Sequence, residues 1–236
     1  MIAIWKREFL AYFKSSIAFV FMGIFMLIAG MFVSLNNILP LTSDFVSSLN
    51  GMQFVFMLLV PILTMRLLSE ERRNKTDQLL LCSPVSVPRI VLGKYFAAVS
   101  VFAVTLLVSA IYPVTMACFG TVSWWEINMC YLGFFLLGCA LISVGVFMSS
   151  ITENQVTSAV ATFGVLLLMY LADSISSAIS IRWVVTLVDW ITIFNRTTDF
   201  SQGIISIGPV LYFASISLIF TFLAIRSVEK RRWSEG

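Results

Sequence analysis

Histidine, the side chain that most often moves protons or binds transition metals, does not occur in this sequence of 236 residues. Without it, Ser–His–Asp triads and most zinc or iron sites are excluded. The four cysteines form no CxxC pair, and three of them lie within apolar runs, which favours buried apolar side chains over a redox or metal site. They are Cys82, Cys118, Cys130 and Cys139.

Phosphate-binding chemistry is also missing from the sequence. An ATP site of the phosphate-loop type follows the pattern GxxxxGK[ST]. The one Gly-Lys pair, Gly93-Lys94, is followed by Tyr95, and Pro88 stands where the first glycine of the pattern belongs. We therefore expect no catalytic residue, no metal and no cofactor in this chain.

One acidic residue, Asp173, lies in or near an apolar stretch that is long enough to cross a membrane. Acids at membrane depth are costly and usually have a function, so Asp173 is a candidate pathway residue. The serines that follow it, at 174, 176 and 177, fit equally well with a wet interfacial position. A single acid without histidine gives little support for intramembrane hydrolysis or a proton relay.

The elements that position these residues are membrane helices. Hydrophobic residues make up 59% of the chain and charged residues 11%, against about 25% charged in a typical soluble domain, which excludes both a water-soluble monomer and a disordered chain. A helical span needs about 20 apolar residues, and backbone groups in lipid must pair internally. The sequence therefore predicts an all-α integral membrane protein with six transmembrane helices, at about 17–35, 51–68, 91–119, 128–149, 156–178 and 204–226.

Lysine and arginine predict the orientation of these spans. Of the 15 basic residues, 13 lie before the first span, between the second and third spans, or after the sixth, and only Arg182 and Arg196 lie on the opposite side. We therefore expect both termini in the cytoplasm.

The first 16 residues are too polar to cross the membrane, and they predict an amphipathic helix at its surface. Ile2, Trp5, Phe9, Tyr12 and Phe13 share one helical face, whereas Lys6, Arg7 and Lys14 lie away from it. Such a helix either anchors the chain to lipid or also contacts a cytoplasmic partner.

The connection between the second and third spans is the only sizeable cytoplasmic segment. We expect the second span to continue as helix beyond the membrane, where Glu71 and Lys75 have the spacing of a favourable ion pair. Thr76 and Asp77 suit a helix start, Pro84 ends that helix near Ser83, and a new helix begins at Ser86-Val87-Pro88. A two-turn helix is unstable alone, so Leu79, Leu80 and Leu81 need cover. They rest on the protein's own surface or, in the interpretation we favour, dock into a separate soluble subunit.

Between the fifth and sixth spans, residues 179–203 are too polar to cross the membrane but carry a short apolar run with two tryptophans. A run of that length predicts a re-entrant or interfacial segment that dips into the outer leaflet as a short helical hairpin.

Several of these segments together resemble ABC-2-type export permeases, and in particular the gliding-motility and nitrous-oxide-reductase-maturation kind. The resemblance covers essentially the whole chain. It rests on residues 65–86 (MRLLSEERRNKTDQLLLCSPVS) and 90–95 (IVLGKY), supported by 5–9 (WKREF), 149–155 (SSITENQ) and 229–233 (EKRRW).

This resemblance implies a single transmembrane domain over residues 1–236, which acts as one subunit of an ATP-driven exporter in the bacterial inner membrane. Its partners would be two copies of a cytoplasmic P-loop ATPase, which binds ATP and Mg²⁺, and a second permease, identical or paralogous. Residues 76–83 would be the coupling helix and 1–14 the connecting helix, with the path formed by spans one, two and five. The residues implied in coupling are Glu70, Glu71, Arg72, Arg73, Thr76, Asp77, Leu79, Leu80 and Pro84, and those in the connecting helix are Trp5, Arg7 and Phe9.

The apolar spans suggest an amphipathic or lipid-like cargo, and nothing indicates nucleic acid. Two alternatives belong to other classes of protein. A membrane anchor or scaffold would bind a cytoplasmic partner without transport. A lipid- or peptide-modifying enzyme would need convergent polar groups within the spans, and the sequence does not provide them.

Overall fold

The computed structural model describes residues 1–40, 42, 45–73, 86–118, 120–176, 193–204 and 206–234 of the chain. Within these ranges the regular secondary structure is helical, and no strand occurs. Six helical segments of the described chain are long and apolar enough to cross a membrane. The prediction of an all-α membrane protein with six spans is confirmed, and the physical reason is that only a helix pairs its own backbone groups in hydrocarbon.

Most span edges lie within a few residues of their expected positions, although the second span begins about six residues earlier than predicted. The spans are Ile17–Ile38 (α2, Ile17–Val33, with the π-helix η1, Ser34–Ile38), Phe45–Arg73 (α3, Phe45–Thr64, with α4, Ser69–Arg73), Val87–Ala117 (α6, Val87–Ser109, with α7, Ile111–Ala117), Trp124–Ile151 (α8), Gln155–Ala172 (within α9, Gln155–Ser176) and Ile207–Lys230 (within α12, Ile207–Ser234).

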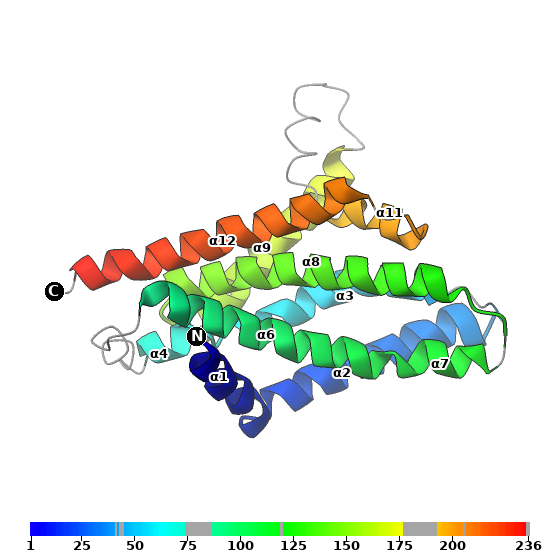
Figure 1. Ribbon diagram of the computed structural model, residues 1–236, viewed down its shortest axis with the longest axis horizontal. Coiled ribbons are helices and arrows are strands. Elements are labelled where there is room, and N and C mark those ends of the chain that lie inside the picture. Colours follow the sequence, from blue (N-terminus) through cyan, green and yellow to red (C-terminus); the bar gives the residue numbers. More distant parts are fainter. Residues whose placement is uncertain are drawn as a thin grey trace.

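Helix α8 is the centre of the bundle, packed against α3, α6, α9 and α12 (Figure 1). Two of its glycines permit this packing. A Cβ atom at Gly138 would lie 2.1 Å from the ring of Phe102 on α6, and one at Gly145 would lie 2.3 Å from the hydroxyl of Thr64 on α3. The helix backbones therefore approach closely along the face of α8 that carries these two glycines.

Both chain termini lie at the same end of the bundle, close to α4 (Figure 1). There, α1 (Ile2–Lys14) packs against the first half of α6. The indole nitrogen of Trp5 donates a hydrogen bond to Ser100 at 2.9 Å, and Ile4 lies against the bare backbone of Gly93. Lys6, Arg7 and Lys14 are exposed. The amphipathic pattern is present, but its apolar side faces helix α6 and not only lipid.

At the opposite end, two short helices close the bundle: η2 (Phe194–Thr197) and α11 (Thr198–Ser201). Gln53 of α3 donates to the hydroxyl of Thr197 at 2.8 Å, and the indole of Trp125 donates to the carbonyl of Gly203 at 3.0 Å. These contacts attach residues 193–204 to α3 and α8. The predicted re-entrant hairpin falls mostly on residues 177–192, outside the described residues.

Two spans are interrupted where the sequence favoured continuous helix. The second span has a turn at residues 65–68 between α3 and α4. The third span breaks at Ala110, between α6 and α7, where Pro113 has no N–H for the carbonyl of Ser109. The predicted start of the third span at Ser86-Val87-Pro88 is confirmed, with Ser86 as N-cap and the proline in the first turn.

The close approach of α8 and α6 at Gly138 generates a test. We expect Gly138→Ala to lower the free energy of unfolding by about 1–3 kcal/mol, because the fully buried ring of Phe102 must shift. Gly164→Ala on α9 is the matched control, since nothing lies within 4 Å of its added Cβ and alanine favours helix. Thermal unfolding in detergent measures both. Equal melting temperatures would contradict this account of the packing.

Candidate functional site

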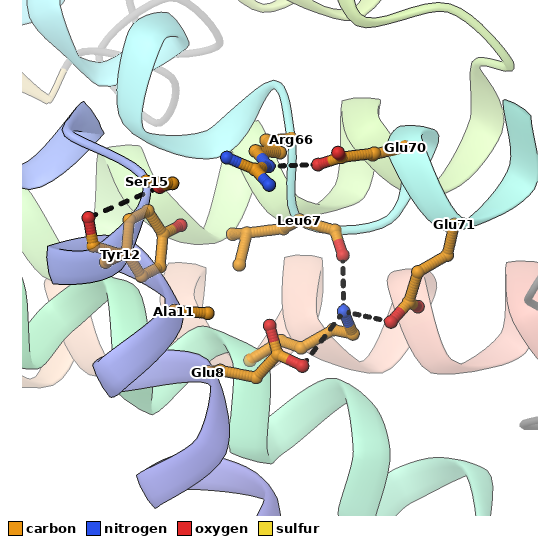
Figure 2. A pocket seen from close by; sticks show the side chains of 9 residues that line it. Glu8, Ala11, Tyr12, Ser15, Arg66, Leu67, Glu70 and Glu71 are labelled. Carbon is orange, nitrogen blue, oxygen red and sulfur yellow. Dashed lines mark hydrogen bonds and ion pairs between the residues drawn. The ribbon is translucent and has the colours of Figure 1, made fainter. Parts of the chain in front are cut away.

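A polar pocket of about 240 Å³ lies at the end of the bundle that carries the two termini. Its lining comes from α1, from the turn at residues 65–68, from α4 and from α6, which are far apart in the sequence. Figure 2 shows acidic and basic side chains from these elements pointing toward one another. The pocket borders α4, the helix that leads into residues 74–85, and α6, which follows them.

Lys94 of α6 connects the walls of this pocket. Its side chain is only 2% exposed, and Nζ donates a hydrogen bond to the carbonyl of Leu67 at 2.7 Å. The same nitrogen lies 2.8 Å from Glu71 Oε1 and 3.6 Å from Glu8 Oε1 (Figure 2). A buried lysine is stable only where acceptors replace its water. We call Lys94, Glu8, Glu71 and Leu67 the lysine cluster.

The turn at residues 65–68 brings the Leu67 carbonyl to Lys94. The N–H of Leu67 donates to the carbonyl of Thr64, three residues earlier, at 3.1 Å. The chain therefore leaves the four-residue hydrogen-bond pattern of an α-helix there. The hydroxyl of Ser149, from the last turns of α8, accepts hydrogen bonds from the backbone N–H groups of Leu68 and Ser69 at 3.1 and 3.2 Å. Side chains from two other spans therefore satisfy backbone groups that the helix interruption frees.

Helix α1 is attached to the same pocket by two further side chains. Tyr12 is buried, and its hydroxyl donates to the carbonyl of Leu63 at 2.7 Å. Burial raises the pKa of the Tyr12 phenol far above its usual value, so it stays a neutral donor. Arg7 Nη2 lies 2.6 Å from Glu8 Oε1 and 3.9 Å from Glu71 Oε1. The hydrogen bond to Glu8 raises the pKa of Arg7.

Helix α4 makes two more ion pairs. Arg66 pairs with Glu70 across one helical turn. Arg72 pairs with Glu153 and donates to the carbonyl of Ile151 at 2.8 Å, which links α4 to the connection between α8 and α9. These pairs are partly exposed, so each contributes little stability alone, about 0–1 kcal/mol. Together they orient α4 on the bundle.

The structure brings together some of the residues that the family resemblance implied. Glu70, Glu71 and Arg72 form the ion pairs described above, Arg73 is exposed at the end of α4, and Trp5 and Phe9 are half-buried on α1. Asp173 lies in the last turns of α9, and its side chain is outside the described part. Thr76, Asp77, Leu79, Leu80 and Pro84 lie outside the described residues altogether.

Sequence reasoning missed the partners of these residues. It counted Lys94 only among the cytoplasmic charges and gave Glu8 and Ser149 no contact. The predicted pair of Glu71 with Lys75 falls outside the described residues, and the contact of Glu71 with Lys94 was not predicted. A signal was available, because Lys94 lies alone between apolar residues of a helix and Glu8 lies one turn from Trp5 on the buried face of α1. Within the described residues, no cluster of acids and cysteines has the geometry of a metal site.

Six helices of the described chain that are long and apolar enough to cross a membrane define a multi-pass membrane protein. A comparison with protein families matches residues 34–228 to the ABC-2 family transporter protein model. The chain therefore belongs to the ABC-2 transporter family and is the transmembrane component of an ABC transporter, a family that normally works with a cytoplasmic ATPase subunit. A comparison with curated proteins finds no significant match.

The burial of Lys94 generates a second test. We expect Lys94→Met to lower the free energy of unfolding by about 3 kcal/mol, because Glu8 and Glu71 then lose the buried cation between them and keep only the exposed Arg7 beside them. The double variant Lys94→Met/Glu71→Gln should recover part of that loss, since one of the two carboxylates is removed.

Arg89→Met is the matched control, because Arg89 is exposed on the same helix. Thermal unfolding in detergent compares the three variants with the wild type. If Lys94→Met and Arg89→Met lose the same stability, the lysine cluster does not hold these elements together.

Proposed function

We propose that this chain is the permease subunit of an ATP-driven exporter that moves an amphipathic or lipid-like cargo across the bacterial inner membrane. Membership of the ABC-2 family supports the general role. The observation that carries the mechanism is the lysine cluster, because it joins the helix that enters residues 74–85 to the helix that leaves them and to α1.

The orientation follows from the charges. Arg66, Arg72, Arg89 and Lys94 lie on the elements that flank residues 74–85, at the end of the bundle that also carries the termini. An excess of arginine and lysine favours the cytoplasmic side of a membrane. We therefore place this end and both termini in the cytoplasm, where a soluble ATPase can reach them.

In the proposed mechanism, residues 76–83 form the coupling helix and bind the ATPase. Their apolar residues Leu79 and Leu80 enter the ATPase surface, while Thr76 and Asp77 begin the helix and Pro84 ends it. Glu70, Glu71, Arg72 and Arg73 flank this segment. ATP and Mg²⁺ are bound by the ATPase, and closure of two ATPase copies displaces the coupling helices.

The lysine cluster transmits the displacement of the coupling helix to α4, α6 and α1. Glu71 on α4 and Lys94 on α6 are in contact at 2.8 Å, so the two ends of the coupling segment move together. Glu8 includes α1 in the same body, and Tyr12 attaches α1 to the end of α3. The turn at residues 65–68 separates this body from α3, and its backbone is held by side chains from other helices. This turn is the hinge at which α4 changes its angle to α3 when the ATPase closes.

The transport path is proposed to lie between two permease copies, identical or paralogous. Helices α2 and α9 leave much of their apolar surface uncovered. Leu27 on α2 is 71% exposed and Leu168 on α9 is 69% exposed. Spans one and five are the ones that the family resemblance assigns, with span two, to the path and the dimer interface. Asp173, in the last turns of α9, is proposed as a polar residue of this path.

Docking of the coupling helix can be tested by exchanging one apolar residue. Leu80→Asp should weaken binding of the ATPase subunit by about thirtyfold, the equivalent of about 2 kcal/mol, because a charge replaces an apolar anchor. Leu80→Met is the matched control and should bind like the wild type. The measurement is co-purification of the co-expressed ATPase, followed by ATP hydrolysis in nanodiscs.

Three outcomes separate the proposal from its alternatives. Reduced binding and reduced hydrolysis with Leu80→Asp support the permease. Normal binding and hydrolysis with Leu80→Asp contradict docking through residues 76–83. Binding without any ATP hydrolysis by the wild-type complex would instead indicate a scaffold.

A further inference from the structure

A second cavity lies at the end of the bundle opposite the lysine cluster. Its volume is about 680 Å³, and its walls come from α2, η1, α7 and the residues that follow η1 and α7. Most of its lining is apolar, with Val33, Ile38, Ile111 and Met116 among the contributing residues. Pockets that hold small apolar ligands have volumes of about 300–1,000 Å³. This cavity is therefore large enough for such a ligand.

The cavity exists because both helices that face it are irregular. The first span changes from α-helix to π-helix at Ser34, with Leu39 N–H donating to the Ser34 carbonyl at 3.0 Å. The third span breaks at Ala110 and continues as α7, which contains Pro113. π-Helical turns are rare and often mark functional sites. Two such interruptions on facing helices separate the helices and leave the space between them.

Tyr112 lines the cavity together with Gly30. Its hydroxyl donates to the carbonyl of Met26 at 2.6 Å, so the ring bridges α7 and α2. Gly30 permits this contact, because a Cβ there would lie 3.0 Å from the same hydroxyl. The cavity extends from these two residues toward Thr42 and Gly120, which lie beyond the ends of η1 and α7. It therefore follows the direction of the two helices, which is also the direction of a lipid chain.

The polar side chains around the cavity are engaged elsewhere. Thr42 donates to the carbonyl of Asn36 at 2.6 Å, and Thr115 donates to that of Tyr112 at 2.7 Å. Asn37 is 3% exposed, accepts from Ser48 at 2.5 Å and donates to the carbonyl of Thr42 at 3.3 Å. The surface left for a ligand is mainly hydrocarbon, which favours an acyl chain over a charged or sugar-containing group.

The cavity is continuous with the surface that faces lipid. Ile38 and Ile111 line it and are 62% and 56% exposed, and Leu35 beside it is 52% exposed. We infer that one acyl chain of a membrane phospholipid occupies this cavity, in the leaflet opposite the lysine cluster, with its methyl end against Tyr112 and Gly30. The bound chain fills the space between α2 and α7 and supports both irregular helices. This inference rests on the membrane spans and does not require ATP-driven transport.

The inference can be tested by photolabelling. The full chain is placed in nanodiscs of phosphatidylethanolamine and phosphatidylglycerol that contain a little phosphatidylcholine with a diazirine at the end of one acyl chain. No ATPase or ATP is added, so a resident lipid is observed and not a transported one. Peptide mass spectrometry should find the label on Val33 and Tyr112. A second phosphatidylcholine, with its diazirine next to the glycerol, should label Thr42 and Gly120 instead.

Three tryptophan variants make this test specific. Thr115→Trp places an indole in the cavity and should reduce the labelling of Tyr112 at least about tenfold, as expected when a filled pocket excludes its ligand. Val114→Trp is the matched control, because Val114 is exposed next to it and does not line the cavity. Ile38→Trp fills the cavity from the other helix and replaces Thr115→Trp if that variant does not fold.

Three results would overturn the inference. One is equal labelling of Tyr112 in the filled variants and the control. Another is labelling of Tyr112 by the glycerol-proximal probe, which would indicate a headgroup or water in the cavity. The last is a disulfide cross-link between two chains that carry Ile38→Cys and Ile111→Cys, combined with no lipid label on Tyr112. That combination would show that a second copy covers this surface.

Discussion

The burial of one lysine is the constraint on which the end of the bundle formed by α1 and α4 depends. A lysine that is 2% exposed is stable only if acceptors surround its nitrogen, and Lys94 obtains them from three different elements. These acceptors are Glu8 on α1, Glu71 on α4 and the carbonyl of Leu67 in the turn before α4. The position of α1 on the bundle and the interruption of the second span both follow from this requirement.

Helix interruptions divide the molecule into a centre of continuous helices and two ends at which the helices are broken. The centre is continuous helix around α8, where Gly138 and Gly145 let neighbouring backbones approach closely. Both ends contain breaks, at residues 65–68 on one side and at Ser34 and Ala110 on the other. Each break frees backbone groups that side chains or a new hydrogen-bond register then satisfy. A permease that changes its access from one side to the other benefits from a stable centre and adjustable ends.

The two cavities, one at each end of the bundle, differ in the chemistry of the side chains that line them. The one beside α1 is lined by charged groups that pair with one another, which suits the transfer of force between protein elements. The one beside α7 is mainly apolar and opens to lipid, which suits an acyl chain. The family to which the chain belongs normally works with a cytoplasmic ATPase subunit.

The sequence by itself determined the all-α fold, the six spans, the amphipathic α1 and the start of α6 at Pro88, because hydropathy, helical periodicity and proline act over a few neighbouring residues. The short helix near 76–83 and its apolar residues came from capping and proline signals, and their assignment to coupling came from a family resemblance. What the tertiary structure decided is which distant charges meet: Glu71 contacts Lys94, and Glu8 completes the cluster. The turn at residues 65–68 also depends on Ser149 and Lys94, from other spans. Such pairings depend on how distant helices pack, and local sequence patterns carry no information on that.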